Sequence, residues 1–366
     1  PTRRSSDLIF KFFIVSIPNI DSIDKELMSE VFSFILAEIL PLGKFHCIIL
    51  REVFFSVECD LSRGENMGNW NDILKEVQNT DTQSQYDKVR RKYLASLAKY
   101  TKRNVVAYYS AWLSKRQANN IDINDSDMEG FMTCVHQMDC GKGLDLVLHT
   151  PGGDPTAAEA IVNYLRDKFK DDIRVIVPQL AMSAGTMIAC AGKEIVMGKQ
   201  SSLGPIDPQF NGIPAHNIKL EFEKAKEDLA NNPQNAQYWA IKLQQYPAAF
   251  MQTAIDAIAL SETLIRDWLG SCMFDSTEPS DANVINEIVA KFNDHNVSKT
   301  HSRHFSADFC KKAGLKINMM ENDQKLQEKI LSMHHAYIIS LNLTNAVKII
   351  ESQNNKSQIS LMPVMM

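Results

Sequence analysis

Ser183 is the residue of this sequence whose type and position could best carry chemistry. It stands between a predicted turn over residues 178–182 and a predicted helix of small residues over 183–191. The free N–H groups and the positive dipole end at a helix start favour negative charge, and acyl transfer by serine needs such donors beside an exposed hydroxyl. The small neighbours Ala184 and Gly185 leave room for a substrate backbone. This arrangement predicts a nucleophilic serine.

A pair of glycines ends the preceding predicted strand. Gly152 and Gly153 follow the apolar run over residues 144–148, and glycine leaves its backbone N–H uncovered and free to adopt unusual dihedral angles. Each motif alone is a weak signal, because Pro-Gly-Gly is usually a tight turn and Ser-Ala-Gly usually caps a helix. Both motifs at consecutive strand ends are far more specific, and they favour an acyl-transfer site.

The elements that must position these motifs repeat along the chain. Predicted strands over residues 144–148 and 173–177 each run through a turn into a helix. Such repeats predict an α/β fold with a parallel sheet and right-handed crossovers. Both turns then lie at the carboxyl edge of the sheet, where α/β folds bind ligands.

Further helices are expected on both sides of these units. The apolar spacing predicts them over residues 125–140, 217–269, 281–295 and 323–352. A polar break is expected at Asn231–Gln234, and the chain end is expected to be frayed.

Three segments carry a family resemblance. His149–Gly153 and Ala181–Thr186 resemble the Clp-type serine peptidase superfamily, and Leu203–Gln209 resembles the serine dehydrogenase proteinase family, which is related to signal peptide peptidase A. The similarity runs from Met67 to at least Lys348. It implies an α/β fold of the Clp/crotonase-like type, a repeated β-β-α spiral with a helical C-terminal region. It also implies an ATP-independent serine endopeptidase.

The resemblance assigns roles to the residues of both turns. Ser183 is implied to be the nucleophile, the N–H groups of Gly153 and Ala184 the oxyanion hole, and Gly152 and Gly185 contacts for substrate. The implied partners are peptide or protein substrates, membrane-protein fragments among them, and further copies of the chain in a homo-oligomer. No cofactor and no metal are expected.

The general base is the point at which this sequence departs from the Clp pattern. The histidine that Clp proteolytic subunits carry soon after their serine is absent, and Ile206 and Asp207 occupy that region. Thr300–Ser306 precedes a short helix and resembles the segment with the third member of the Clp-type triad. We therefore take His301 as the first candidate base, because imidazole suits proton transfer near neutral pH. Asp207 is the candidate carboxylate that orients it.

Other bases stay open at this point. His216 is one, and Lys219 and Lys224 are others, since signal peptide peptidases of the related type use a lysine. Acidic neighbours of both lysines favour a solvated helix face instead. A loop position without a catalytic role is the alternative interpretation of His301 and His304.

Two other functions also stay open. A crotonase-like acyl-CoA enzyme would share the two backbone N–H groups of the oxyanion hole. Such an enzyme does not need a serine at position 183, and the sequence has no cluster of basic residues near the turns to bind the CoA phosphates. A catalytically inactive oligomeric scaffold of the same fold would account for the missing histidine.

The composition limits the class of protein. The chain has 366 residues, is 45% hydrophobic and carries a net charge of −5, which gives no attraction to nucleic acid. Its seven cysteines form no C-x-x-C pair and predict reduced thiols. His334 and His335 lie within one predicted helix on different faces, which favours packing over metal ligation. No apolar run is long enough to span a membrane. We expect a cytoplasmic protein and leave membrane association open.

The chain is expected to have three parts. Pro1–Leu8 resembles a translated sequencing adapter and is excluded from the fold argument. Residues 1–66 are interpreted as a non-native or poorly ordered leader, with Met67 as the preferred start. The rival interpretation is a genuine extension with a short helical hairpin. The peptidase domain is expected over residues 67–320, and a C-terminal helix with a frayed tail over 321–366.

Overall fold

The computed structural model describes residues 73–76, 85–294 and 298–362. The chain divides into two compact units, residues 1–66 and 67–366, and every described residue belongs to the second. The interpretation of residues 1–66 as a leader therefore lies outside the described part of the chain.

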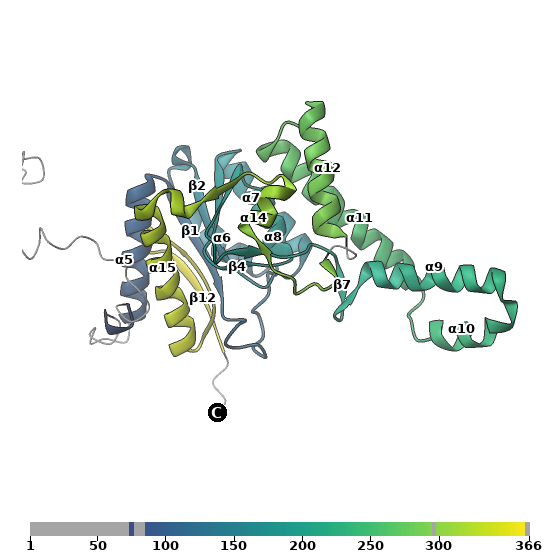
Figure 1. Ribbon diagram of the computed structural model, residues 1–366. Coiled ribbons are helices and arrows are strands. Elements are labelled where there is room, and N and C mark those ends of the chain that lie inside the picture. The colour runs from purple at the N-terminus through teal and green to yellow at the C-terminus, as the bar shows by residue number, and fades with distance from the viewer. Residues whose placement is uncertain (1–72, 77–84, 295–297, 363–366) are drawn as a thin grey trace, which may run out of the picture. The chain divides into compact units, whose positions relative to one another are not determined.

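A seven-stranded sheet forms the centre of the second unit (Figure 1). Five neighbouring strands are parallel, and two more extend the sheet beyond β1 in antiparallel pairing. From edge to edge the strands are β10 (Ile317–Met319), β5 (Glu194–Met197), β3 (Ile173–Val177), β2 (Leu144–His149), β1 (Asn104–Ser110), β11 (Ala346–Ser352) and β12 (Ser357–Leu361).

Helices cover both faces of this sheet. Leu146 and Leu148 of β2 pack in one hydrophobic core, whereas Val147 between them packs in the other, because successive strand residues point to opposite faces. The first core includes residues of α6 (Asp127–Val135), α7 (Pro155–Phe169) and α8 (Ala184–Cys190), and the second includes residues of α5 (Gln85–Thr101) and α15 (Gln324–Leu343). Strands covered on both faces read as continuous apolar runs, which is why β2 and β3 were recognisable in the sequence.

A smaller sheet follows the ends of the long strands. It consists of β4 (Leu180–Ala181), β6 (Ser202–Leu203) and β9 (Phe305–Ser306), and Thr150 forms a bridge to Ala181 of β4. A long strand, a short strand and a helix follow one another in β3, β4 and α8. The same order holds for β2, Thr150 and α7. These are the β-β-α units of the predicted Clp/crotonase-like fold, which is confirmed.

The region after the small β7–β8 hairpin is mainly helical. The predicted break at Asn231–Gln234 is present, because α9 ends there and a 3₁₀ turn follows. A second break, after α10, was not predicted. The elements are β7 (Gln209–Phe210), β8 (Ile213–Pro214), α9 (Ala215–Asn231), η3 (Pro233–Asn235), α10 (Ala236–Leu243), α11 (Phe250–Trp268), η4 (Leu269–Met273), α12 (Pro279–Asn293), α14 (Ala307–Ala313) and η5 (Met320–Asn322). None of the helices in the described ranges combines the length and apolar character that crossing a membrane requires.

Two predicted helices end earlier than expected. The helix predicted over residues 125–140 is α6, which stops at Val135, and Gln137 beyond it has a positive φ of 63°. A short 3₁₀ turn, η2 (Cys140–Lys142), occupies the rest. The chain turns away because the next residues must enter β2.

The predicted helix over residues 323–352 is confirmed as far as Leu343, but its last part and the described part of the predicted frayed tail are strands. Helix α15 ends at Leu343, and the chain continues into β11 and β12. Ile349 packs in the core with α15 and Ile350 in the opposite core, so the alternation is that of a strand. A short apolar run does not distinguish the two states by itself. β11 and β12 therefore extend the same sheet.

Candidate active site

The two turns singled out in the sequence are joined by backbone hydrogen bonds. The N–H of Thr150 donates to the carbonyl of Leu180 (3.1 Å), and the N–H of Met182 donates to the carbonyl of Thr150 (3.0 Å). Thr150 immediately precedes the Pro-Gly-Gly turn, and Met182 immediately precedes Ser183. The bridge therefore holds the end of β2 against the start of α8.

Gly152 is the point of closest approach between the turns. Its φ is +98°, which L side chains rarely adopt. A Cβ built there would lie 2.6 Å from the Cβ of Ser183, 2.6 Å from the carbonyl oxygen of Met182 and 2.9 Å from the N of Ala184. No larger residue fits without moving the two turns apart.

Gly153 lies beside a different segment, the residues before α6. The N–H of Ile123 donates to the Gly152 carbonyl (2.8 Å), and the N–H of Asp154 donates to the Ile123 carbonyl (2.9 Å). In a parallel bridge of this kind the flanking residues make the bonds, so the N–H of Gly153 itself points away from Ile123. A Cβ at Gly153 would lie 2.3 Å from the Ile123 carbonyl oxygen. The bridge and the glycine together leave this N–H uncovered.

Ser183 has a strained backbone. Its φ is +51° and its ψ is −119°, a conformation that non-glycine residues rarely adopt and that often marks a functional position. It precedes the first residue of α8, yet its side chain makes no capping hydrogen bond to that helix. The Ser183 side chain therefore does not act as the helix cap that Ser-Ala-Gly usually provides. Ser183 instead lines the pocket described below.

His301 and Asp207 are in direct contact. His301 Nδ1 lies 2.9 Å from Asp207 Oδ1, and Gln209 Nε2 donates to Asp207 Oδ2 at 2.7 Å. Asp207 is fully buried, whereas the His301 side chain is 28% exposed. A carboxylate at Nδ1 directs Nε2 of the ring to the opposite side. The pairing of His301 with Asp207 agrees with the sequence prediction, whereas Gln209 was part of the Leu203–Gln209 motif but had no role assigned to it.

Two contacts bring these distant residues together. Leu203 of β6 pairs with Phe305 of β9 in antiparallel register, which places the His301 loop beside the chain that leads to Asp207. On the other side, the N–H of Gly204 donates to the hydroxyl of Thr186 in α8 (2.9 Å). The segment between Gly204 and Asp207 is thereby tied both to the helix that follows Ser183 and to the strand that follows His301.

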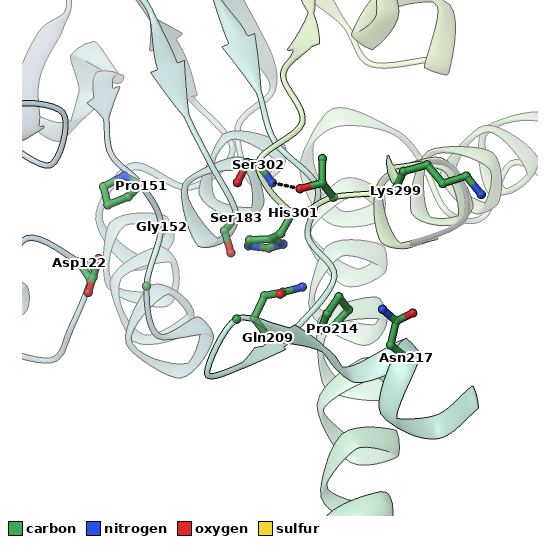
Figure 2. Close-up of a pocket in the computed structure, with 13 residues that line it drawn as sticks. Asp122, Pro151, Gly152, Ser183, Gln209, Pro214, Asn217, Lys299, His301 and Ser302 are labelled. Atoms are coloured by element: carbon green, nitrogen blue, oxygen red, sulfur yellow. Dashed lines mark hydrogen bonds between the residues drawn. The ribbon is translucent and has the colours of Figure 1, made fainter. Parts of the chain in front are cut away.

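Ser183 and His301 line the same pocket, whose volume is about 750 Å³. In Figure 2 the His301 ring lies on the side of the pocket where the Ser183 hydroxyl points. The lining residues are Asp122, Pro151, Gly152, Gly153, Ser183, Gln209, Gly212, Pro214, Asn217, Lys299, Thr300, His301 and Ser302.

The structure does not bring the alternative bases to this pocket. Lys219 of α9 forms an ion pair with Glu223 (3.8 Å), and both side chains are about half exposed. Lys224 lies on the same helix, and His216 lies one residue before Asn217 without lining the pocket itself. Among the described residues, no group of three or more His, Cys, Asp or Glu side chains could hold a metal ion.

A buried histidine lies beneath the glycine turn. His149, the last residue of β2, is fully buried, and neither ring nitrogen has a hydrogen-bond partner in the described part of the chain. Burial lowers the pKa of its imidazole to about 4. Its ring packs 5.5 Å from that of His334 in α15. His149 is therefore neutral at physiological pH and belongs to the packing below the site.

The fold and the serine turn are similar to those of the Clp class of serine peptidases. Residues 89–234 match the family model of the ClpP-like SDH-type serine proteinases. This range contains both glycines, Ser183 and Asp207, while His301 lies beyond it. This match supports the predicted relationship to the serine dehydrogenase proteinase family.

Two archaeal proteins are similar to this chain. The uncharacterized protein MJ0137 of Methanocaldococcus jannaschii is 38% identical over 110 residues, and the uncharacterized protein MJ1495 of the same organism is 35% identical over 109 residues. Each match covers 30% of this chain. The chain spans only 38% and 37% of the lengths of these relatives.

Proposed function

We propose that this protein is a serine endopeptidase in which Ser183, His301 and Asp207 act as a catalytic triad. The observation that carries the proposal is that Ser183 and the Asp207-bonded His301 line one pocket. A fully buried carboxylate at Nδ1 holds the imidazole in one orientation and stabilises its protonated form during reaction.

The reaction would proceed through an acyl-enzyme. His301 Nε2 takes the proton of the Ser183 hydroxyl as its oxygen attacks the peptide carbonyl. The N–H groups of Gly153 and Ala184 donate to the oxyanion of the tetrahedral intermediate. His301 then passes the proton to the leaving amine, and a water activated in the same way releases the acyl group.

The strained Ser183 backbone supports this mechanism. A catalytically inactive scaffold would need neither a positive φ at serine nor a carboxylate–imidazole pair beside it. Peptides or unfolded protein segments, membrane-protein fragments among them, are the substrates that a pocket open to solvent would accept, as the relation to signal peptide peptidase A implies. Assembly into a homo-oligomer stays a prediction.

A fluorophosphonate probe tests the proposal, because it reacts only with an activated serine. The Ser183→Ala protein should lose labelling and peptidase activity completely and keep its melting temperature, since removing one hydroxyl leaves little cavity. Ser302→Ala is the matched control, because it removes a second hydroxyl from the same pocket. Full labelling of the Ser183→Ala protein, or loss only in Ser302→Ala, would contradict the assignment.

A further inference from the structure

One acidic side chain lines the pocket beside the glycine turn. Asp122 immediately precedes Ile123, the residue that bridges Gly153, so its position is set by the same backbone pairing that shapes the candidate oxyanion site. Figure 2 shows Asp122 beyond the Gly152 turn from His301. Its carboxylate is therefore placed along the pocket from the reacting serine and not at the reacting atoms.

No side chain or backbone N–H of the described residues donates a hydrogen bond to the Asp122 carboxylate. In the described part of the chain, the hydrogen bonds made to Asp122, from Lys348 Nζ (2.7 Å) and Asn124 Nδ2 (2.9 Å), go to its backbone carbonyl. The ammonium of Lys348 is already paired with the carboxylate of Asp127 at 2.6 Å. Asp122 is exposed to solvent, and partial desolvation raises the pKa of its carboxyl, against a smaller opposing effect of Lys348. A negative charge in this setting is stabilised by an additional cation.

The rest of the pocket supplies no competing acidic group. Lys299 is the one basic residue among the other lining residues, which also include the candidate base His301. Lys299 belongs to the His301 loop, so the positively charged and negatively charged residues of the lining come from different segments of the chain. A bound peptide that extends from Ser183 past Gly153 would reach the Asp122 end.

We propose that Asp122 is a specificity-determining residue that binds a positively charged group of the peptide substrate at a subsite away from the scissile bond. This inference rests on the proposed peptidase function. The charged group is a lysine or arginine side chain or a free α-amino terminus, since an ammonium or guanidinium would form the charge-assisted hydrogen bonds that the carboxylate lacks.

A set of internally quenched peptides tests the proposal. Both ends are blocked, and lysine, norleucine or glutamate is placed in turn at each position before and after the cleaved bond. One more peptide carries a free amino terminus. In the unsubstituted protein, lysine at one position should raise kcat/KM about tenfold over norleucine, as expected for a hydrogen bond to a charged group. If kcat/KM rises only for the peptide with a free amino terminus, the group bound by Asp122 is the α-amine.

The ratio of the lysine and norleucine rates within one protein is the readout, because it is independent of the fraction of active enzyme. Asp122→Asn should bring this ratio close to one. The Asp122→Lys protein should cleave the glutamate peptide faster than the norleucine peptide. Asp125→Asn, which removes an exposed carboxylate three residues further on that does not line the pocket, should keep the ratio.

If the charge preference found in the unsubstituted protein, for lysine over norleucine or for the free over the blocked terminus, is unchanged in Asp122→Asn, the inference is overturned. The absence of any charge preference in the unsubstituted protein would overturn it too. Failure of the peptidase function itself has a different signature, namely no fluorophosphonate labelling of Ser183. In that case direct binding of the same peptides to the protein, measured by fluorescence anisotropy, still decides whether Asp122 selects the lysine peptide over the norleucine peptide.

Discussion

Ser183 and His301 differ from the lysines of α9 in what surrounds them. The His301 ring is fixed through Nδ1 by a buried carboxylate, which is itself held by Gln209. Lys219 instead forms a solvent-exposed ion pair with Glu223. A base must be fixed within reach of the proton that it removes. These surroundings favour His301 over Lys219 as the general base.

The comparison of bases can be made by substitution. His301→Ala should lower the rate of Ser183 acylation by on the order of a hundred- to ten-thousand-fold, the usual contribution of general-base catalysis. Lys219→Ala and Lys224→Ala should change the rate less than twofold, about the scatter of a rate assay. The measurement is stopped-flow acylation by an activated ester. If one lysine variant is not acylated while the His301→Ala protein is acylated at the full rate, the site is a serine-lysine dyad instead.

At the scale of elements, the long strands were predictable and the short ones were not. The predicted strand over residues 173–177 coincides with β3, because a buried parallel strand is rich in valine and isoleucine and only Arg174 interrupts this run. The two-residue strands β6 and β9 have no periodicity to detect. Their pairing places the His301 loop, so the proximity of Asp207 and His301 could be expected only from the family resemblance.

Polar contacts inside the site were hidden for the same reason. Neither the bond from Gln209 to Asp207 nor the packing of Thr186 against Gly204 follows from local sequence, because each depends on segments that tertiary structure brings together. The glycine turn was recognisable, since the positive φ values of Gly152 and Gly153 require that residue type. A backbone conformation that only glycine adopts can be recognised in a sequence. A polar contact between distant segments cannot, because it leaves no local pattern.

The packing of β2 against α15 should make stability depend on pH. The pKa of His149 is lowered to about 4 in the folded protein from an ordinary value of 6.5, and burial also lowers the pKa of His334, which faces it. A lowered histidine pKa means that the unfolded chain binds more protons. The contribution of His149 to stability is therefore full above pH 6.5, falls as the pH drops towards 4 and levels off below that value. The loss from His149 alone is about 3 kcal/mol.

Substitution of His149 isolates this effect from the titration of other groups. The groups that face it are His334, with His335 beside it, and the neutral rings of Tyr109 and Trp112. The difference in unfolding free energy between His149→Phe and the unsubstituted protein should shift in favour of the variant by about 2 kcal/mol between pH 8 and pH 5. Urea unfolding at both pH values measures it. A difference that is independent of pH would show that His149 is not buried in its neutral form.

At the scale of the whole second unit, β11 joins elements from both ends of the chain. Glu351 of β11 is fully buried and accepts hydrogen bonds from Arg90 Nε (3.0 Å) and Arg91 Nε (2.9 Å) of α5 and from the hydroxyl of Tyr337 in α15 (2.8 Å). β11 also pairs with β1 and lies between it and the edge strand β12. One carboxylate thus connects the two helices of one layer to the strand beneath them.

Glu351→Gln should therefore destabilise the protein by about 3 kcal/mol or more, because it leaves the guanidinium of Arg90, which is only 2% exposed, with insufficient countercharge. Asp87 also contacts Arg90 at 2.6 Å, but it is partly exposed and cannot replace the buried carboxylate. The matched control is Glu287→Gln, whose partner Lys291 lies 3.0 Å away on the surface of α12. Exposed pairs contribute at most about 1 kcal/mol, so the control should unfold at nearly the urea concentration of the unsubstituted protein. Equal midpoints for the two variants would show that β11 is held to α5 by apolar packing and not by the buried charge.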